Sequence, residues 1–231
     1  DVFAATAALI FAGPVILLAA AGVRLFSRGP AFYLAQRAGV DGRPFTLYKL
    51  RTMHIDHGNS LSVVTGVADT RVFVFGGLLR KLKIDELPQL WNIIRGDMSI
   101  VGPRPEDLKI VHEYYDDPGM RTLKVRPGLS GIGSIYYYTH GEQLLTGDNP
   151  EQLYVEKLLP IKLALELVYI RKMSLACDLQ IIARTAMALL KISLGVRTFT
   201  LPPELEEAEQ LLSRHSTASL PPAETQLRRA A

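Results

Sequence analysis

The feature that most constrains the fold of this chain is an uncharged segment near its start. None of the 22 residues from Val2 to Val23 carries a charge. As a straight helix the segment would span about 33 Å at roughly 1.5 Å per residue, which is enough to cross a hydrocarbon core of roughly 30 Å. No basic region precedes it and no clear cleavage site comes after it, which disfavours a secretory signal peptide. We therefore predict that residues 1–28 form a membrane-inserted helical element.

A proline interrupts the middle of this segment, where Pro14 follows Gly13. Proline inside a helix removes one hydrogen bond and clashes with the preceding turn, so we expect a kink there. Two interpretations are open. In the first, an ordinary spanning helix tolerates the proline, as many spanning helices do. In the second, a broken, re-entrant helix enters one leaflet and returns to the same side. From these residues alone, the spanning helix is the simpler interpretation.

The charge pattern after the apolar segment indicates where the rest of the chain lies. Between Asp1 and Ile55 there are six Lys or Arg residues against two acids. Basic residues directly after a hydrophobic segment favour a cytoplasmic location for the domain attached to it, and they suit a surface of anionic lipid headgroups. The formal net charge of only +3, without a recognised nucleic-acid motif, argues against a nucleic-acid partner. The single cysteine, Cys177, excludes an internal disulfide framework and fits a reducing compartment.

Periodicity and turn residues predict an α+β fold: a compact, helix-rich domain over residues 29–200 with short strands. The final helix of this domain either lies at the membrane interface or packs against the core. Beyond Leu201 the composition turns to Pro, Glu, Ser and Ala, so residues 201–231 are expected to form a flexible tail. The predicted strands are Phe32–Leu34, Phe45–Leu50, Met98–Val101 and Ser134–Tyr138, and the main predicted helices are Leu87–Ile94, Leu108–Tyr115, Glu151–Ile170 and Leu175–Leu194.

Two adjacent carboxylates, Asp85 and Glu86, carry the most informative chemistry. They precede Pro88, which suits the first turn of a helix. In a purely structural interpretation, Asp85 caps the helix and Glu86 interacts with the positive end of its dipole. In a functional interpretation, the helix start attracts phosphate and one carboxylate attacks phosphorus as a nucleophile. The neighbouring carboxylate then holds Mg²⁺, which offsets the charge of a diphosphate.

Four basic residues support the functional interpretation. Lys49 and Arg51 are two apart, so on a strand they would share one face, although a solvated strand face is an equally common role. Arg104 lies between two prolines that restrict the local backbone, a setting that suits bidentate phosphate binding. Arg126 before a Pro-Gly pair repeats the pattern more weakly. Together with Asp85 and Glu86, these residues predict a site that handles phosphate.

The motifs closely resemble those of the bacterial sugar transferase family, the monotopic phosphoglycosyl transferases that initiate glycan assembly on polyprenol phosphate. The resemblance covers roughly residues 1 to 195. The blocks that carry it are Tyr48–Met53, Asp85–Gln89, Gly96–Glu106, Arg126–Gly131 and Tyr169–Ser174.

The resemblance implies a two-step reaction. Asp85 would attack the sugar-bearing phosphate of a UDP-sugar and release UMP, with Mg²⁺ bound by Glu86 and phosphate contacted by Arg104. The phosphosugar would then pass from Asp85 to undecaprenyl phosphate. Gly13-Pro14 falls at the family's helix break, so the resemblance favours the re-entrant helix. It also implies a catalytic domain on the cytoplasmic face of the bacterial inner membrane, in contact with membrane lipids.

The chain departs from the family pattern at two places. Gly13 replaces the usual serine at the helix break, and Ile132-Gly133-Ser134 follows the glycine loop where many relatives carry an aromatic or amide residue. The second departure leaves the sugar open, and the sequence does not decide the oligomeric state, a homodimer included. Tyr136-Tyr137-Tyr138 is interpreted as strand packing, with stacking on a uracil ring as the alternative. The rival function is a non-catalytic membrane module that binds a lipid carrier or a partner protein.

Overall fold

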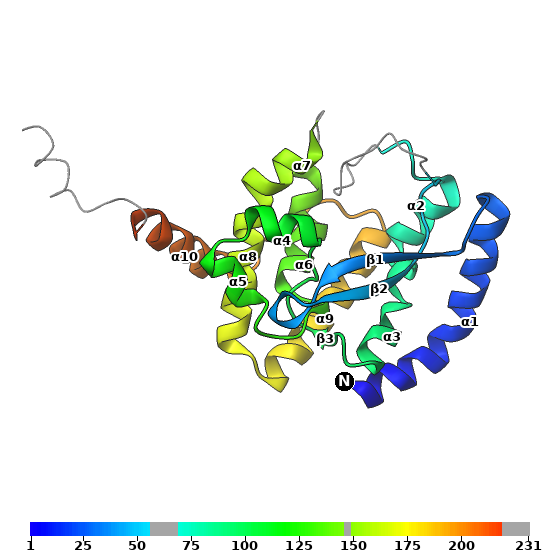
Figure 1. Cartoon of the computed structure of the whole chain (residues 1–231), viewed down its shortest axis with the longest axis horizontal. Helices are drawn as coiled ribbons and strands as arrows, with labels where there is room; N and C mark the ends of the chain where they lie inside the picture. The colour runs from blue at the N-terminus through cyan, green and yellow to red at the C-terminus, as the bar shows by residue number, and fades with distance from the viewer. Residues whose placement is uncertain (56–68, 146–148, 219–231) are drawn as a thin grey trace, which may run out of the picture.

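The structure is a computed structural model that describes residues 1–55, 69–145 and 149–218. The predicted α+β class is confirmed, because helices predominate and the strands form two small two-stranded sheets (Figure 1). Its helices are α1 (Val2–Phe26), α2 (Val74–Lys81), α3 (Gln89–Ile94), α4 (Leu108–Tyr114), α5 (Asp117–Thr122), α6 (Ile132–Tyr136), α7 (Pro150–Leu153), α8 (Leu159–Lys172), α9 (Leu175–Ser193) and α10 (Leu205–Ala218).

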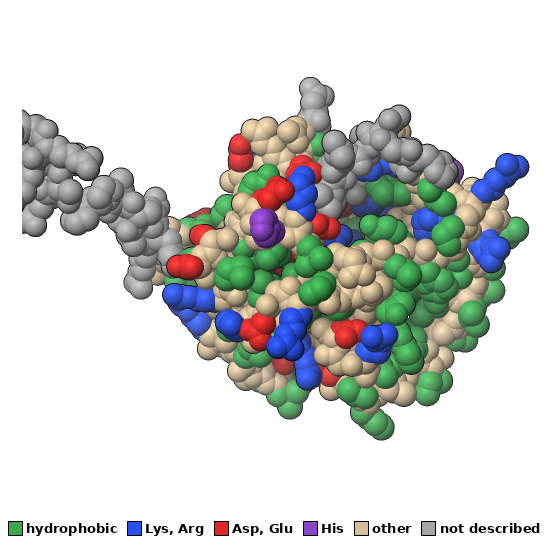
Figure 2. Space-filling view, viewed as in Figure 1, with side chains coloured by type: hydrophobic (Ala, Val, Ile, Leu, Met, Phe, Trp, Pro, Cys, Tyr) green, Lys and Arg blue, Asp and Glu red, His purple; other side chains and the backbone are tan. Residues whose placement is uncertain are grey.

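Helix α1 is continuous through Pro14, but Figure 1 shows that it changes direction along its length. A proline inside a helix is the usual cause of such a bend. Among the described residues, α1 is the one helix with the length and hydropathy to cross a membrane. Most of its apolar side chains face outward; Phe3 is 89% exposed and Phe11 is 82% exposed. Figure 2 shows hydrophobic side chains gathered along the side of the molecule that α1 forms.

The inner side of α1 lies along the rest of the chain. Ala5, close to its start, is buried with Leu90 and Ile93 of α3. Near its end, Val23 is buried in a second cluster that includes Phe73 and Leu79. Because both halves of the helix contribute to these clusters, α1 packs against the domain over most of its length.

The first sheet pairs β1 (Phe32–Ala38) with β2 (Pro44–Leu50) in antiparallel register, which confirms the two predicted strands and extends the first. A short 3-10 turn, η1 (Val40–Gly42), connects them. Within it Gly42 has a φ of 73°, a left-handed conformation that glycine adopts without steric cost.

The second sheet pairs β3 (Ser99–Val101) with β4 (Gly128–Ser130) in parallel. The predicted strand Met98–Val101 is therefore confirmed with a slightly later start. A Cβ atom at Gly128 would lie 2.0 Å from the backbone nitrogen of Gly102, so this close approach requires glycine. The pairing anchors the loop Gly102–Pro105 that follows β3.

The main hydrophobic core surrounds α8, where Leu165 and Val168 are fully buried. The predicted helices in this region are confirmed: α8 continues from α7 through the π-helical turn η5 (Tyr154–Leu158), and α9 follows. Exposed apolar residues run along α9, among them Leu175, Leu179 and Leu190. Helix α9 therefore packs on the core with one face and presents apolar side chains on the other.

Two predictions about the second half of the chain are wrong. The predicted strand Ser134–Tyr138 is instead helical, formed by α6 and the π-helical turn η3 (Tyr137–Gly141). All five residues of α6 are buried, and a short apolar run has the same pattern in a buried strand and a buried helix.

The predicted flexible tail over residues 201–231 contains the helix α10. Its residues Ala208 and Leu211 are buried in the core around α8, and Arg184 of α9 forms an ion pair with Glu204 at 2.5 Å just before the helix begins. These tertiary contacts order a segment whose polar composition predicted disorder. Residues 219–231 lie outside the described part of the chain.

Candidate active site

Asp85 and Glu86 lie in a 3-10 turn, η2 (Ile84–Glu86), directly before α3. Both side chains are almost completely buried, with exposed fractions of 5% and 6%. The Asp85 carboxylate caps no helix, and its buried Oδ1 atom has no hydrogen-bond partner among the described residues. An unpaired buried oxygen is costly in a folded protein, and such atoms are common where a ligand is to be bound. The capping interpretation of Asp85 therefore fails.

The two cations nearest the pair come from distant parts of the chain. Lys49 of β2 places its Nζ atom 3.7 Å from Asp85 Oδ2 and 3.2 Å from Glu86 Oε1. Arg104, in the loop after β3, places its Nη2 atom 2.7 Å from Glu86 Oε1. The structure thus brings together four of the residues that the sequence predicted as a phosphate-handling site.

Asn92 of α3 joins the strand that carries Lys49 to the helix that begins after the two acids. Its side chain is fully buried and bridges to β2: Nδ2 donates to Thr46 O at 2.7 Å, and Oδ1 accepts from Tyr48 N at 3.1 Å. Since backbone groups of β2 hold both ends of this amide, Asn92 connects α3 to the strand that carries Lys49.

Burial and charge affect the two acids in opposite ways. Burial raises the pKa of Glu86, but the positive charges of Arg104, Lys49 and Lys83 more than offset it and hold that pKa well below its usual range. For Asp85, burial raises the pKa and Lys49 opposes this only in part. The surrounding cations therefore favour the charged form of Glu86, whereas burial disfavours the charged form of Asp85.

Two further residues complete the site, and the sequence analysis assigned neither to it. Tyr138 of η3 accepts a hydrogen bond from Arg104 Nη1 at 2.7 Å, and its hydroxyl donates to Glu86 Oε2 at 3.4 Å. Lys83 places its Nζ atom 3.7 Å from the centroid of the Tyr138 ring. Lys83 is two residues from Asp85, so proximity in sequence was an available signal for it. For Tyr138 the sequence analysis preferred strand packing, with stacking on a uracil ring as the alternative, and did not predict its contacts with the charged groups of the site.

The other two predicted phosphate ligands lie elsewhere. Strand β2 ends at Leu50, so the alternation that would place Arg51 beside Lys49 stops before it. Instead Arg51 is buried and donates to Ser27 O at 2.8 Å and to Pro30 O at 2.6 Å, where it binds the C-terminal end of α1. Arg126 is exposed just before β4, and its side chain makes no hydrogen bond or ion pair with any described residue.

A second buried network holds the loop that carries Arg104. The backbone N–H of Arg104 donates to Glu166 Oε1 of α8 at 3.1 Å. Next along the loop, Glu106 accepts a hydrogen bond from Lys162 Nζ at 2.5 Å and another from the Tyr154 hydroxyl. Lys162 and Glu166 are each 2% exposed, so this polar network lies inside the core. It fixes the backbone from which the Arg104 side chain reaches Glu86.

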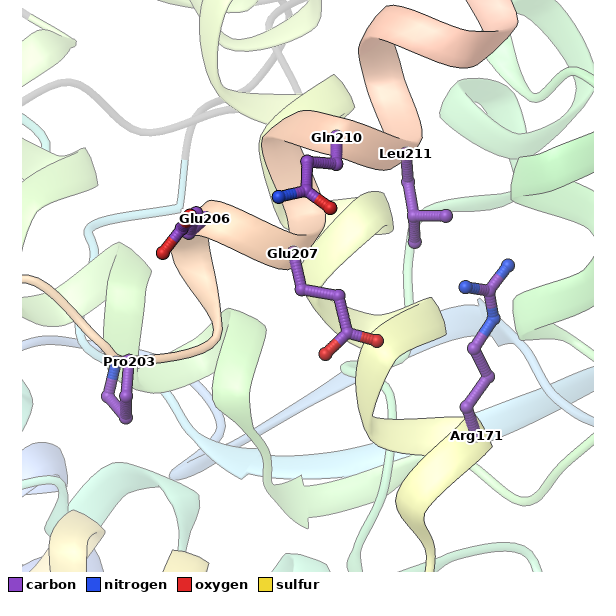
Figure 3. Close-up of a pocket in the computed structure, with 6 residues that line it drawn as sticks. All are labelled: Arg171, Pro203, Glu206, Glu207, Gln210 and Leu211. Carbon is purple, nitrogen blue, oxygen red and sulfur yellow. The ribbon is translucent and has the colours of Figure 1, made fainter.

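A separate cavity of about 440 Å³ lies between α10 and the end of α8, and Figure 3 shows its lining. Glu206 and Glu207 of α10 and Arg171 of α8 contribute to it, and Lys172 forms an ion pair with Glu207. None of the acids or cations described above lines this cavity, so it is distinct from the candidate active site.

Comparison with known proteins identifies the family. The family profile described as "Bacterial sugar transferase" matches residues 1–192. The UDP-glucose:undecaprenyl-phosphate glucose-1-phosphate transferase of Caulobacter vibrioides is 36% identical over 194 residues, covering 82% of this chain and 68% of the relative. A protein of the same name from Xanthomonas campestris pv. campestris is 36% identical over 199 residues, but this chain spans only 38% of its length. The exopolysaccharide production protein ExoY of Rhizobium meliloti is 36% identical over 203 residues, covering 81% of this chain and 82% of the relative. The chain belongs to the bacterial sugar transferase family.

Proposed function

We propose that this chain transfers a sugar 1-phosphate from a UDP-sugar to undecaprenyl phosphate and so initiates the assembly of a membrane glycan. The names of the Caulobacter and Xanthomonas relatives describe this type of reaction with UDP-glucose. A relative from Aeromonas hydrophila, 33% identical over 192 residues, is named for UDP-N-acetylgalactosamine, so relatives differ in the sugar. The observation that carries the proposal is the buried Asp85, whose Oδ1 is unpaired and whose Oδ2 lies 3.7 Å from Lys49 Nζ, next to the Glu86–Arg104 ion pair.

The proposed chemistry proceeds in two displacements at phosphorus. An oxygen of the Asp85 carboxylate attacks the sugar-bearing phosphorus of the UDP-sugar, the bond to the bridging oxygen breaks, and UMP leaves with the electron pair. A phosphate oxygen of undecaprenyl phosphate then attacks the same phosphorus. This breaks the acyl-phosphate bond, restores the Asp85 carboxylate and forms the lipid diphosphate sugar. Lys49 and Arg104 stabilise the negative charge that develops on the phosphoryl oxygens.

We propose Mg²⁺ as the cofactor. The described residues contain no group of three or more His, Cys, Asp or Glu side chains that would hold a metal by themselves. Mg²⁺ fits this site nonetheless, because it commonly binds one or two carboxylates and takes its other ligands from water and substrate phosphates. Glu86 would hold it, with the adjacent Asp85 Oδ1 as an unpaired oxygen nearby. When bound, the ion supplies charge compensation for the diphosphate.

The packing of α1 supports a re-entrant helix rather than a spanning one. At its start, Ser99 Oγ donates to the Asp1 side chain at 2.7 Å, so this end contacts the domain at β3. At its other end, Arg51 binds the backbone of Ser27. A helix that crossed the membrane would place its two ends on opposite sides, and one domain could not contact both. We therefore propose that α1 inserts into one leaflet and leaves the catalytic domain on the cytoplasmic face.

The experiment that tests this function is an intact-mass measurement on protein in nanodiscs, mixed with Mg²⁺ and a panel of UDP-sugars. We expect a sugar-phosphate adduct on the wild type that is absent from Asp85→Asn. Asp117→Asn is the matched control, because Asp117 is an exposed aspartate at the start of α5. The mass of the adduct would also identify the sugar. If the wild type binds donors but forms no adduct and releases no UMP when lipid phosphate is added, the non-catalytic membrane module replaces this proposal.

A further inference from the structure

We propose that the ammonium group of Lys83 binds the diphosphate of the donor, and that the Tyr138 ring holds it in position before the donor arrives. This inference rests on the proposed function and assigns a binding role to two residues of the same site. Neither role follows from the sequence motifs that define the phosphate-handling site.

The backbone of Lys83 indicates that its position is specified. Its φ of 55° and ψ of 21° are left-handed, and Asp41 is the other non-glycine residue with positive φ among those the structure describes. This conformation costs a lysine about 1 kcal/mol or more and persists where the surrounding structure enforces it. Its consequence is the sharp turn from α2 into η2, which places Lys83 over the Tyr138 ring and Glu86 at the Tyr138 hydroxyl.

Lys83 differs from the other two cations of the site in its free hydrogen-bonding capacity. Lys49 and Arg104 direct their donors to the carboxylates of Asp85 and Glu86. The ammonium of Lys83 has three donors, yet within the described ranges it makes no hydrogen bond or ion pair, and it lies over the face of the Tyr138 ring. The residue is only partly buried.

The charge of the site favours an anion at this ammonium. Lys49, Lys83 and Arg104 carry three positive charges against the two carboxylates. Burial lowers the pKa of Lys83, and the negative charge of Glu86 opposes this shift only in part. A partly desolvated ammonium without an acceptor gains more from a phosphate oxygen than a solvated one would.

Tyr138 connects Lys83 to the rest of the site. Its ring supports the ammonium through a cation–π contact, while its hydroxyl bonds Arg104 and Glu86. The hydroxyl contacts Arg104 and Glu86, whereas the ring centroid lies 3.7 Å from Lys83 Nζ and 5.6 Å from Arg104 Cζ, so loss of the ring should affect Lys83 most strongly. Tyr138 is thus a positioning residue for both cations.

The test measures the affinity of the full chain in nanodiscs for UDP, which carries the diphosphate without a sugar, and the KM and kcat for the donor. Lys83→Met should weaken UDP binding about tenfold or more, the size expected for one charge-assisted hydrogen bond. Lys83→Arg should restore most of it. Lys83→Asn is a second neutral variant whose side chain tolerates the left-handed backbone, so a loss shared by both neutral variants is not a folding defect. The control is Lys81→Met at the exposed end of α2, which should bind UDP as the wild type does.

The role of Tyr138 is tested by comparing Tyr138→Phe with Tyr138→Leu, which differ in the aromatic ring but both lack the hydroxyl. With Lys83 present, the leucine variant should bind UDP more weakly than the phenylalanine variant. In the Lys83→Met background the difference between the two should become smaller, because the ring then supports only Arg104, whose Cζ atom lies 5.6 Å from the ring centroid. Unchanged UDP affinity and donor KM in both neutral Lys83 variants, with a wild type that forms the covalent adduct, would overturn this inference alone. A wild type that binds no UDP would overturn the proposed function as well.

Discussion

Glu166 provides a quantitative test of the buried network that holds the Arg104 loop. Its side chain is 2% exposed, its Oε1 accepts the hydrogen bond from Arg104 N, and its Oε2 has no partner among the described residues. Burial raises the pKa of this carboxyl from 4.5 to about 7, although Lys162 opposes the shift. Near neutral pH the folded protein therefore holds a proton here that the unfolded chain has released.

The sign of the effect on stability follows from this difference. The stabilisation from the raised pKa is complete below pH 4.5 and is lost as the pH rises through about 7. At about 1.36 kcal/mol per pKa unit, the difference between 4.5 and about 7 corresponds to about 3 kcal/mol of folding stability. Glu166→Gln removes the titration but keeps the shape and the oxygen that accepts from Arg104. Relative to the wild type, its free energy of unfolding should therefore rise by about 3 kcal/mol between pH 4.5 and pH 8.

The assay is denaturant unfolding of the detergent-solubilised full chain at pH 4.5, 6 and 8, followed by the fluorescence of Trp91, the single tryptophan. Taking the difference between variant and wild type cancels the titration of groups common to both proteins. Glu113→Gln on the exposed side of α4 is the control and should show a difference that does not change with pH. A Glu166→Gln difference that is equally constant would refute the reasoning, because it would mean that Glu166 titrates alike in the folded and unfolded chain.

The packing of the chain leads to further expected outcomes. Gly128→Ala should prevent folding, because its Cβ would lie 2.0 Å from a backbone nitrogen of the loop after β3. Gly13→Ala meets nothing within 4 Å and should raise the free energy of unfolding by up to about 1 kcal/mol; equal behaviour of the two alanine variants in thermal unfolding would contradict this. Arg104→Met should cost about 3–5 kcal/mol of stability and abolish UMP release, because the charge of Glu86 loses its bidentate partner; a fully stable variant would count against the pairing. Leu211→Ala should cost about 2 kcal/mol or more in denaturant unfolding, and no change would mean that α10 does not dock.

Features of the fold that depend on local pattern were predictable from the sequence. The length and apolarity of Val2–Val23 indicated a helix long enough to enter a membrane, and the structure shows a helix from Val2 to Phe26. Turn residues separated the strands now seen as β1 and β2, and the helices α8 and α9 followed from their apolar periodicity. The adjacent acids, Asp85 and Glu86, with Lys49 and Arg104, formed a recognisable chemical set because their residue types and motif spacing are themselves local information.

The remainder was decided by contacts between distant parts of the chain. Arg51 has the charge of a phosphate ligand, but the free carbonyls at the end of α1 bind it instead. Tyr138 bonds to Arg104 because Ile132–Gly141 is helical and does not form the predicted strand. A short buried apolar run has the same pattern in a strand and in a helix, so the sequence did not distinguish the two. Helix α10 is ordered because Leu211 packs into the core around α8. Residue types and local spacing specified which groups could perform the chemistry. Long-range packing selected those that meet, because burial and hydrogen bonding depend on neighbours that are far apart along the chain.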